Sequence, residues 1–216
     1  MIVKNWMSKS PDTISSELLA KEAINLFEEN RVPFMPVVDN GKFRGLIARR
    51  DLREAAAWAI ATQDIYEVQY FNEQLKVKDI MVRKPVTLSV DDTVETALEK
   101  GKNFSRSFLP VMEGDKLVGT LSNRDFTHAL NQLLGGEEDL HGICIEVNED
   151  TRITIKKILE DIFTLGIQIQ GLFTLKDPDS GVKRLTIRFE AKCLKKIVSL
   201  IKKKGYNLIE VVKRKQ

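Results

Sequence analysis

The chain has 216 residues, of which 43% are hydrophobic and 30% charged, a balance typical of a globular protein with one or two domains. Its two cysteines, Cys144 and Cys193, lie in no metal-ligand or disulfide pattern, and no stretch approaches the roughly 20 apolar residues that span a bilayer. We therefore expect a cytoplasmic protein without a membrane partner. The net charge of +3 is too small to indicate nucleic-acid binding by itself.

Charge is nevertheless distributed unevenly along the chain. Residues 1–140 contain 18 Lys or Arg against 22 Asp or Glu, whereas residues 141–216 contain 16 against 9. This change of sign predicts a domain boundary near residue 140.

An internal repeat is the strongest signal in the acidic part. Residues 3–52 align without a gap to residues 77–126, at a constant offset of 74, with 14 identical pairs in 50. Chance would give about three identities at ordinary residue frequencies. The chain therefore contains two copies of one unit, and because one copy is too small to bury a good core, the two should pack together.

Each copy predicts the same series of elements. An extended Pro-x-Thr-apolar piece precedes an amphipathic helix, then a strand–turn–strand hairpin, and then a helix that begins near Asp51 or Asp125. The hairpin strands cover residues 34–38 and 42–48 in the first copy. Residues 54–71 between the copies are helix-prone, and we interpret them as an extended last helix followed by a connector.

The basic part has a different pattern. A strand at residues 142–147 precedes a helix whose apolar face includes Ile155, Ile158 and Ile162. Two strands then flank a Pro- and Gly-containing loop at residues 177–181, and a lysine-rich helix over residues 191–204 precedes a last strand. The resulting order, βαββαβ, predicts a ferredoxin-like sandwich and an α+β fold class.

These motifs carry a family resemblance. The Pro-x-Thr-apolar piece, the Leu/Met-Pro-Val strand and the closing Gly-x-x-[Ser/Thr/Ala]-x-x-Asp resemble a tandem CBS-domain pair, the module named after cystathionine beta-synthase. A βαββαβ unit attached to such a pair resembles the ACT regulatory domain, and the whole arrangement is similar to AcuB-type (acetoin utilisation) proteins. The expected domains are repeat 1 (residues 1–56), a helical connector (57–75), repeat 2 (76–134) and an ACT-like domain (141–216).

The resemblance implies a ligand site at the end of each hairpin. In repeat 2, Asp125 would bind a ribose, Ser122 would bind a phosphate with Arg124 nearby, and the backbone around two further dipeptides would frame an adenine. Those dipeptides are Thr87-Leu88 and Leu109-Pro110. The alternative is a capping box, in which Ser122 and Asp125 only satisfy the backbone N–H groups at a helix start.

Repeat 1 lacks the hydroxyl group, because Ala48 occupies the position of Ser122. We expect its site to be weaker, different in ligand or empty, with Arg49 and Arg50 compensating by charge or Asp51 acting as a plain helix cap. The corresponding candidate residues of repeat 1 are Thr13, Ile14, Pro36, Arg50 and Asp51.

The function expected from this reasoning is regulatory and not enzymatic. No catalytic or metal-ligating set is present, and we expect no obligatory cofactor. The regulatory ligand would be AMP, ADP or ATP, with S-adenosylmethionine after them, bound by a homodimer. Two alternatives are an assembly protein with vestigial sites that docks a partner enzyme, and a DNA-associated regulator that uses the lysine-rich helix.

Overall fold

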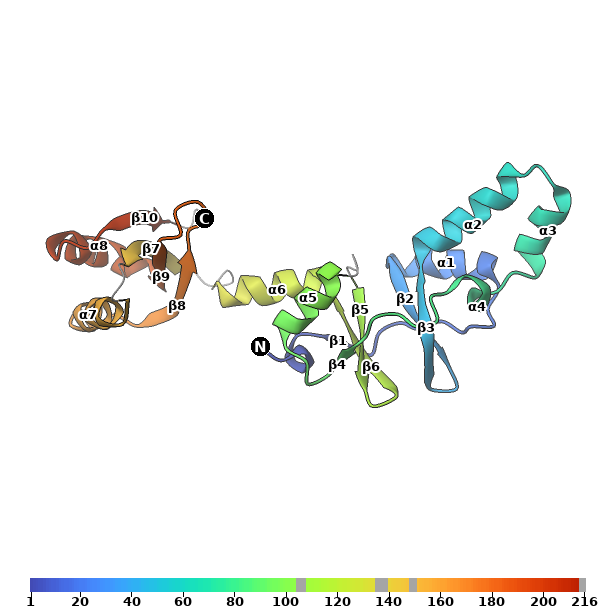
Figure 1. Cartoon of the computed structure of the whole chain (residues 1–216), viewed down its shortest axis with the longest axis horizontal. Coiled ribbons are helices and arrows are strands. Elements are labelled where there is room, and N and C mark those ends of the chain that lie inside the picture. The colour runs from blue at the N-terminus through green and yellow to red at the C-terminus, as the bar shows by residue number, and fades with distance from the viewer. Residues whose placement is uncertain (104–107, 135–139, 148–150, 214–216) are drawn as a thin grey trace. The chain divides into compact units, whose positions relative to one another are not determined.

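The computed structural model describes residues 1–103, 108–134, 140–147 and 151–213 and divides the chain into two compact units, residues 1–127 and 128–216. Figure 1 labels the elements and colours them from blue at the N-terminus to red at the C-terminus. None of the described helices combines the length and the apolar character that crossing a membrane requires.

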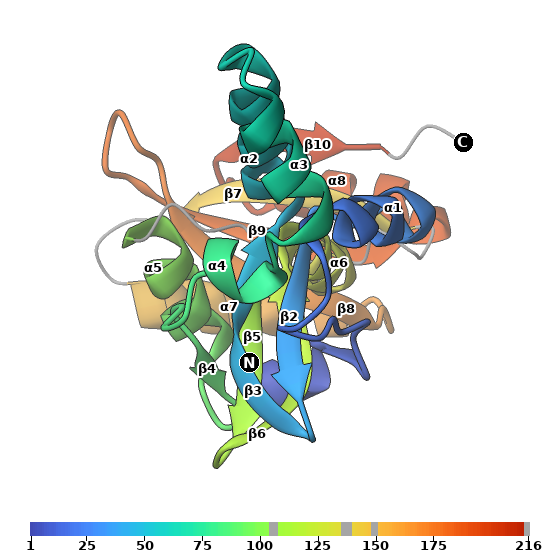
Figure 2. The ribbon, with the colours of Figure 1, turned by 90° about the vertical axis from the view of Figure 1, so that its right-hand side faces the viewer.

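The first repeat has the predicted elements. Helix α1 packs beside the β2–β3 hairpin, and α2 follows the hairpin directly; Figure 2 turns this repeat toward the viewer. The hairpin turn is Asn40-Gly41, and both residues have positive φ angles (51° and 75°), as a two-residue turn of type I′ requires. The elements are α1 (Ala20–Asn30), β2 (Phe34–Asp39), β3 (Lys42–Ala48) and α2 (Arg49–Ala61).

An apolar cluster holds the first repeat together. Phe27 of α1 is fully buried against Met35 and Ile47 of the hairpin and Leu52 of α2. These side chains come from all four elements, so burial of apolar surface fixes their mutual packing.

The second repeat uses the same plan. Its hairpin pairs Phe108 with Ser122, as the first hairpin pairs Phe34 with Ala48, and β4 adds a short parallel strand beside β5. A second cluster contains Leu88, Leu109, Val111 and Leu121. The elements are β4 (Leu88–Ser89), α5 (Val94–Asn103), β5 (Phe108–Glu113), β6 (Lys116–Ser122) and α6 (Asn123–Leu133).

The stretch between the repeats forms separate helices. The expected extended helix ends at Ala61, and α3 (Ile65–Glu73) begins after Asp64, whose carboxylate accepts the Tyr66 N–H at 2.9 Å. The short helix α4 (Val77–Ile80) opens the second repeat and corresponds, at the offset of 74, to the 3-10 helix η1 (Val3–Asn5) that opens the first.

The two repeats exchange their opening segments. Ser8 of the first repeat, in β1 (Ser8–Lys9), pairs with Thr120 of β6, and Val82 of the second repeat pairs with Leu46 of β3. These two pairs are equivalent at the offset of 74, so the exchange follows the internal repeat. The repeats also meet where the rings of Phe34 and Phe108, again equivalent residues, stack at 5.6 Å between centroids.

The second unit has the predicted βαββαβ order. Its four strands form one antiparallel sheet in the order β10-β7-β9-β8, and Ile143, Ile145 and Ile187 pack in one core with Ile158 and Ile197 of the helices. The elements are β7 (Leu140–Val147), α7 (Thr151–Phe163), β8 (Ile169–Lys176), β9 (Lys183–Glu190), the 3-10 helix η2 (Ala191–Cys193), α8 (Leu194–Lys203) and β10 (Leu208–Val212).

Candidate functional site

The junction between β6 and α6 brings the main predicted pair together. Ser122 is the last residue of β6, and Asp125 lies in the first turn of α6. The Ser122 backbone N–H and hydroxyl both donate to Asp125 Oδ2, at 2.7 and 2.6 Å. The bond from the backbone N–H is one half of a capping box. The structure therefore has the hydrogen bond of the capping alternative, and it also has Ser122 and Asp125 close together, as the ligand-site prediction requires.

A third donor reaches the same carboxylate from the exchanged segment. The hydroxyl of Ser8 in β1 donates to Asp125 Oδ1 at 3.0 Å. A carboxylate offers about four lone-pair positions, and the three donors use most of them. The Asp125 carboxylate is therefore held in one orientation by two different segments of the chain.

The equivalent junction of the first repeat is arranged differently. Ala48 and Val82, which correspond to Ser122 and Ser8, have no hydroxyl to offer Asp51, and α2 begins without a side-chain hydrogen bond at its N-terminus. Asp51 instead lies 3.7 Å from the Nε of Arg50. The two repeats thus share the carboxylate but differ in each described side-chain contact that holds it.

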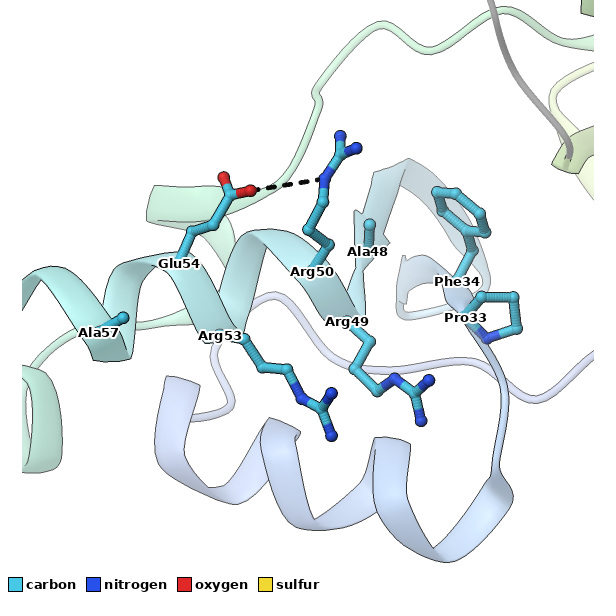
Figure 3. Close-up of a pocket in the computed structure, with 8 residues that line it drawn as sticks. All are labelled: Pro33, Phe34, Ala48, Arg49, Arg50, Arg53, Glu54 and Ala57. Atoms are coloured by element: carbon cyan, nitrogen blue, oxygen red, sulfur yellow. Dashed lines mark ion pairs between the residues drawn. The ribbon is translucent and has the colours of Figure 1, made fainter.

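A pocket of about 400 Å³ opens beside this first junction. Figure 3 shows Arg49 and Arg53 projecting from the same side of α2, with Arg50 and Glu54 on another side, 3.7 Å apart. Arg53 also lies 3.5 Å from Glu28 of α1. The lining residues are Pro33, Phe34, Ala48, Arg49, Arg50, Arg53, Glu54 and Ala57.

The pocket combines an apolar wall with guanidinium groups, so it suits an anionic ligand that has a flat apolar part. Of the residues predicted for the first-repeat site, Arg50 lines this pocket, whereas Asp51 does not. Neighbouring acidic groups partly offset the charges of the three arginines. The pocket is therefore less favourable for an anion than the arginines alone would make it.

Five of the other predicted residues are buried. The side chains of Ile14, Leu88 and Leu109 are buried in the two cores, and the Ile14 N–H and carbonyl are both used by the backbone of the first hairpin. Pro36 and Pro110 are also buried, with Pro110 paired to Thr120.

Two predicted threonines and one arginine remain more accessible. Thr13 is exposed, Thr87 is half-buried with its carbonyl accepting from Lys100 Nζ at 3.3 Å, and Arg124 is exposed at the start of α6. Among the described interactions, none of these three residues contacts Asp125 or Asp51 directly.

Sequence reasoning missed Ser8, Arg53 and the Phe34–Phe108 stack. Arg53 lies four residues after Arg49 on a predicted helix, so helical spacing could have placed both on one face. Ser8 gave no such signal, because its repeat equivalent is Val82 and nothing in the sequence indicates that the opening segments exchange.

The lysine-rich helix of the second unit borders another shallow hollow, of about 480 Å³. Lys195, Lys196 and Lys203 line it with Ser199, one helical turn or two apart along α8. The apolar stripe of the same helix, including Ile197 and Ile201, is buried in the core, as the sequence predicted.

The first unit is a tandem-repeat module. Its two hairpin copies exchange their opening segments, and each copy has an Asp at its strand–helix junction. The family model of the CBS domain matches residues 3–57 and 77–132. The chain therefore belongs to the CBS-domain family, as the motifs predicted.

Known protein structures are similar to about two thirds of the chain. The acetoin utilization protein AcuB of Vibrio cholerae is 21% identical, with a TM-score of 0.52 over 63% of this chain and 95% of that one. The CBS pair of protein MJ0100, solved with 5′-methylthioadenosine and S-adenosylmethionine, is 25% identical, with a TM-score of 0.50 over 64% and 98%.

An enzyme is also among the similar proteins. Homoserine O-acetyltransferase of Methanococcus vannielii is 28% identical over 131 residues, which are 60% of this chain. The chain spans about a quarter of that enzyme's length.

Proposed function

We propose that the chain is a non-catalytic regulatory protein whose CBS pair binds an adenine nucleotide, mainly at the β6–α6 junction of the second repeat. The observation that carries this proposal is the Asp125 carboxylate, which three donors hold in one orientation beside a helix start. An oriented carboxylate is suited to the two hydroxyl groups of a ribose, and preorganisation lowers the cost of binding. The MJ0100 pair, with two adenosine ligands, supports this ligand class.

In this proposal the rest of the second site follows the family pattern. Ser122 and Arg124 contact the phosphate, and the backbone of Thr87-Leu88 and Leu109-Pro110 frames the adenine. AMP, ADP and ATP are the first ligands to test, and S-adenosylmethionine follows. The first-repeat site, with Thr13, Ile14, Pro36, Arg50 and Asp51, would bind more weakly because Ala48 supplies no hydroxyl.

The same proposal includes an output. Ligand binding would change the balance between arrangements of the two repeats, to the extent that the ligand binds one arrangement better. The βαββαβ unit would act as an ACT-like domain that relays this change or assembles a homodimer. The site of action would be the cytoplasm, with a partner enzyme as the regulated target.

The test is calorimetric titration and thermal unfolding of the full chain with AMP, ADP, ATP and S-adenosylmethionine. Asp125→Ala should weaken binding by about 10- to 100-fold, because a hydrogen bond to a charged group contributes about 1.5–3 kcal/mol. Asp51→Ala removes the equivalent carboxylate of the other repeat and serves as the matched control. Unchanged affinity in a folded Asp125→Ala variant would contradict the assigned role.

The docking alternative predicts that the chain binds none of these ligands. If the sites are vestigial, none of these ligands should raise the unfolding temperature, whereas a ligand at 100 times its Kd should add about 2.7 kcal/mol of stability. A folded wild-type chain without any shift would therefore favour a docking protein.

A further inference from the structure

The pocket of about 400 Å³ beside the first junction is built mainly on one broad face of α2. Five of its lining residues belong to this helix, and at about 100° per residue they span roughly 140° of its circumference, a sector that leaves out Asp51. The pocket is therefore separate from the carboxylate of the first junction. The five residues are Arg49, Arg50, Arg53, Glu54 and Ala57.

Backbone contacts fix the two sides of this pocket relative to each other. The Arg49 N–H donates to the Pro33 carbonyl oxygen at 3.0 Å, and Phe34 pairs with Ala48 in the hairpin. The Phe34 ring is also stacked on Phe108, at 5.6 Å between centroids. The apolar wall is therefore in place without a ligand, and such preorganisation lowers the cost of binding.

The arginines of the pocket are only loosely paired. Arg50 Nε lies 3.7 Å from a carboxylate oxygen of Asp51 and 3.7 Å from one of Glu54, and Arg53 lies 3.5 Å from a glutamate of α1. These separations exceed the roughly 2.7–2.9 Å of a charged hydrogen bond. Because exposed ion pairs of this kind contribute little to stability, an incoming anion can replace them at small cost.

The second repeat lacks most of this positive charge. At the offset of 74, Arg49 and Arg53 correspond to Asn123 and Thr127, and only the third arginine of the pocket has an arginine as its counterpart. The lining residues of the pocket carry three positive charges and one negative charge, although residues 1–140 are acidic overall. The arginines thus form a local concentration of positive charge that is specific to the first repeat.

We infer that this pocket binds a small anion with two or more adjacent phosphate groups. A guanidinium group binds phosphate oxygens with two parallel N–H donors. Arg49 and Arg53 lie one helical turn apart and project from the same side of α2 (Figure 3), so each of them takes a different phosphate group. The apolar wall keeps water from one side of the ligand and so strengthens these interactions. This inference goes beyond the proposed function and does not depend on it.

The experiment is calorimetric titration of the full chain with inorganic triphosphate and with inorganic phosphate. Triphosphate should bind at least about 10-fold more tightly than phosphate, because it reaches a second arginine. Arg49→Asn and Arg53→Thr install the residues of the second repeat, and each should weaken triphosphate binding by about 10-fold, the effect of one charged hydrogen bond. The double variant Lys21→Asn/Lys42→Thr removes two exposed charges outside the pocket and is the matched control.

The glutamate of the pocket gives a prediction of the opposite sign. Glu54→Gln removes the one carboxylate among the lining residues and should tighten triphosphate binding by about 2- to 5-fold, the effect of one exposed charge. Ala57→Glu adds a carboxylate to the same face and should weaken binding by a similar factor. Both substitutions keep a good helix former in α2, so a loss of folding cannot account for effects of opposite sign.

Three results would overturn the inference. They are no binding of triphosphate to the folded wild-type chain, no greater weakening in Arg49→Asn and Arg53→Thr than in the lysine control, and weaker binding in Glu54→Gln. Asp125→Ala separates the inference from the proposed function, because this variant should lose affinity for AMP and keep its affinity for triphosphate. If triphosphate binds through the arginines and no adenine ligand binds, only the proposed function fails. If AMP binds through Asp125 and triphosphate does not bind, only this inference fails.

Discussion

The exchange of opening segments can be tested at Gly45, where β3 meets the Val82 segment. A Cβ atom added to Gly45 would lie 2.4 Å from the Val82 carbonyl oxygen and 3.2 Å from its carbonyl carbon. Both are backbone atoms, so no side-chain rotation can relieve the clash. Gly45→Ala should therefore push the Val82 segment away from β3.

The cost can be worked from the bonds that this movement breaks. Leu46 N–H donates to Val82 O at 3.0 Å, and Val82 N–H donates to Leu46 O at 2.8 Å. Two such bonds contribute about 1–3 kcal/mol together, and alanine returns about 0.4–1 kcal/mol by restricting the unfolded chain. We expect a net loss of about 1–2 kcal/mol in the free energy of unfolding of the first unit.

Urea unfolding would measure this loss, and hydrogen exchange at Leu46 and Val82 would locate it. Gly119→Ala tests the equivalent contact, since its Cβ would lie 2.7 Å from Met7 Sδ and 2.8 Å from the Ser8 carbonyl oxygen. Gly171→Ala is the control, because the nearest atoms to its Cβ are side-chain carbons of Arg188 at 3.3 and 3.4 Å. If Gly45→Ala changed neither the free energy of unfolding nor the hydrogen-exchange rates at Leu46 and Val82, the contact between β3 and the Val82 segment would be refuted.

Three other predictions concern the two cores and the first-repeat site. Phe27→Ala should destabilise the first unit by about 3–5 kcal/mol in urea unfolding, because its side chain is fully buried. Burial and the hydrogen bond to Asp161 raise the pKa of Tyr206 to about 12, so the second unit should lose stability as pH rises from about 10 to 12. Tyr206→Phe should remove this part of the alkaline slope in urea titrations at a series of pH values. Ala48→Thr should tighten any nucleotide binding beside Asp51 by about 2- to 10-fold in calorimetry, and an unchanged affinity and stoichiometry would show that the missing hydroxyl is not the limit there.

The hairpins and the βαββαβ order could be predicted because local patterns specify them. Asn40-Gly41 between two apolar runs indicates a tight turn, and the structure has both positive φ angles there. The alternation of Leu185 and Ile187 with polar neighbours indicates a strand with one buried face, and both residues are fully buried. In each case the signal lies within about ten residues.

The exchanged segments could not be predicted because they depend on contacts between distant residues. The bond between Ser8 and Asp125 joins residues 117 apart, and no periodicity links them. The break between α2 and α3 is easier to predict from the sequence, because Asp64 is a good helix cap. Its carboxylate accepts the Tyr66 N–H in the structure. The helix-forming composition of residues 54–61 outweighed that signal in the sequence reasoning.

The divergence between the repeats bears on how the pair would respond to a ligand. The second junction holds Asp125 by three hydrogen bonds and ties it to the opening segment of the first repeat, whereas the first junction leaves Asp51 beside Arg50 alone among its described side-chain contacts. In the proposed function, a ligand at Asp125 must displace part of an existing network, and a ligand at Asp51 need not. The bond between Ser8 and Asp125 joins the two repeats, so a ligand at Asp125 binds directly beside a contact between them. A ligand can shift the conformational equilibrium of the pair only through a differential interaction with its two arrangements. In the proposed function the second repeat is therefore the sensing half of the pair, although the described pocket of about 400 Å³ lies beside the junction of the first.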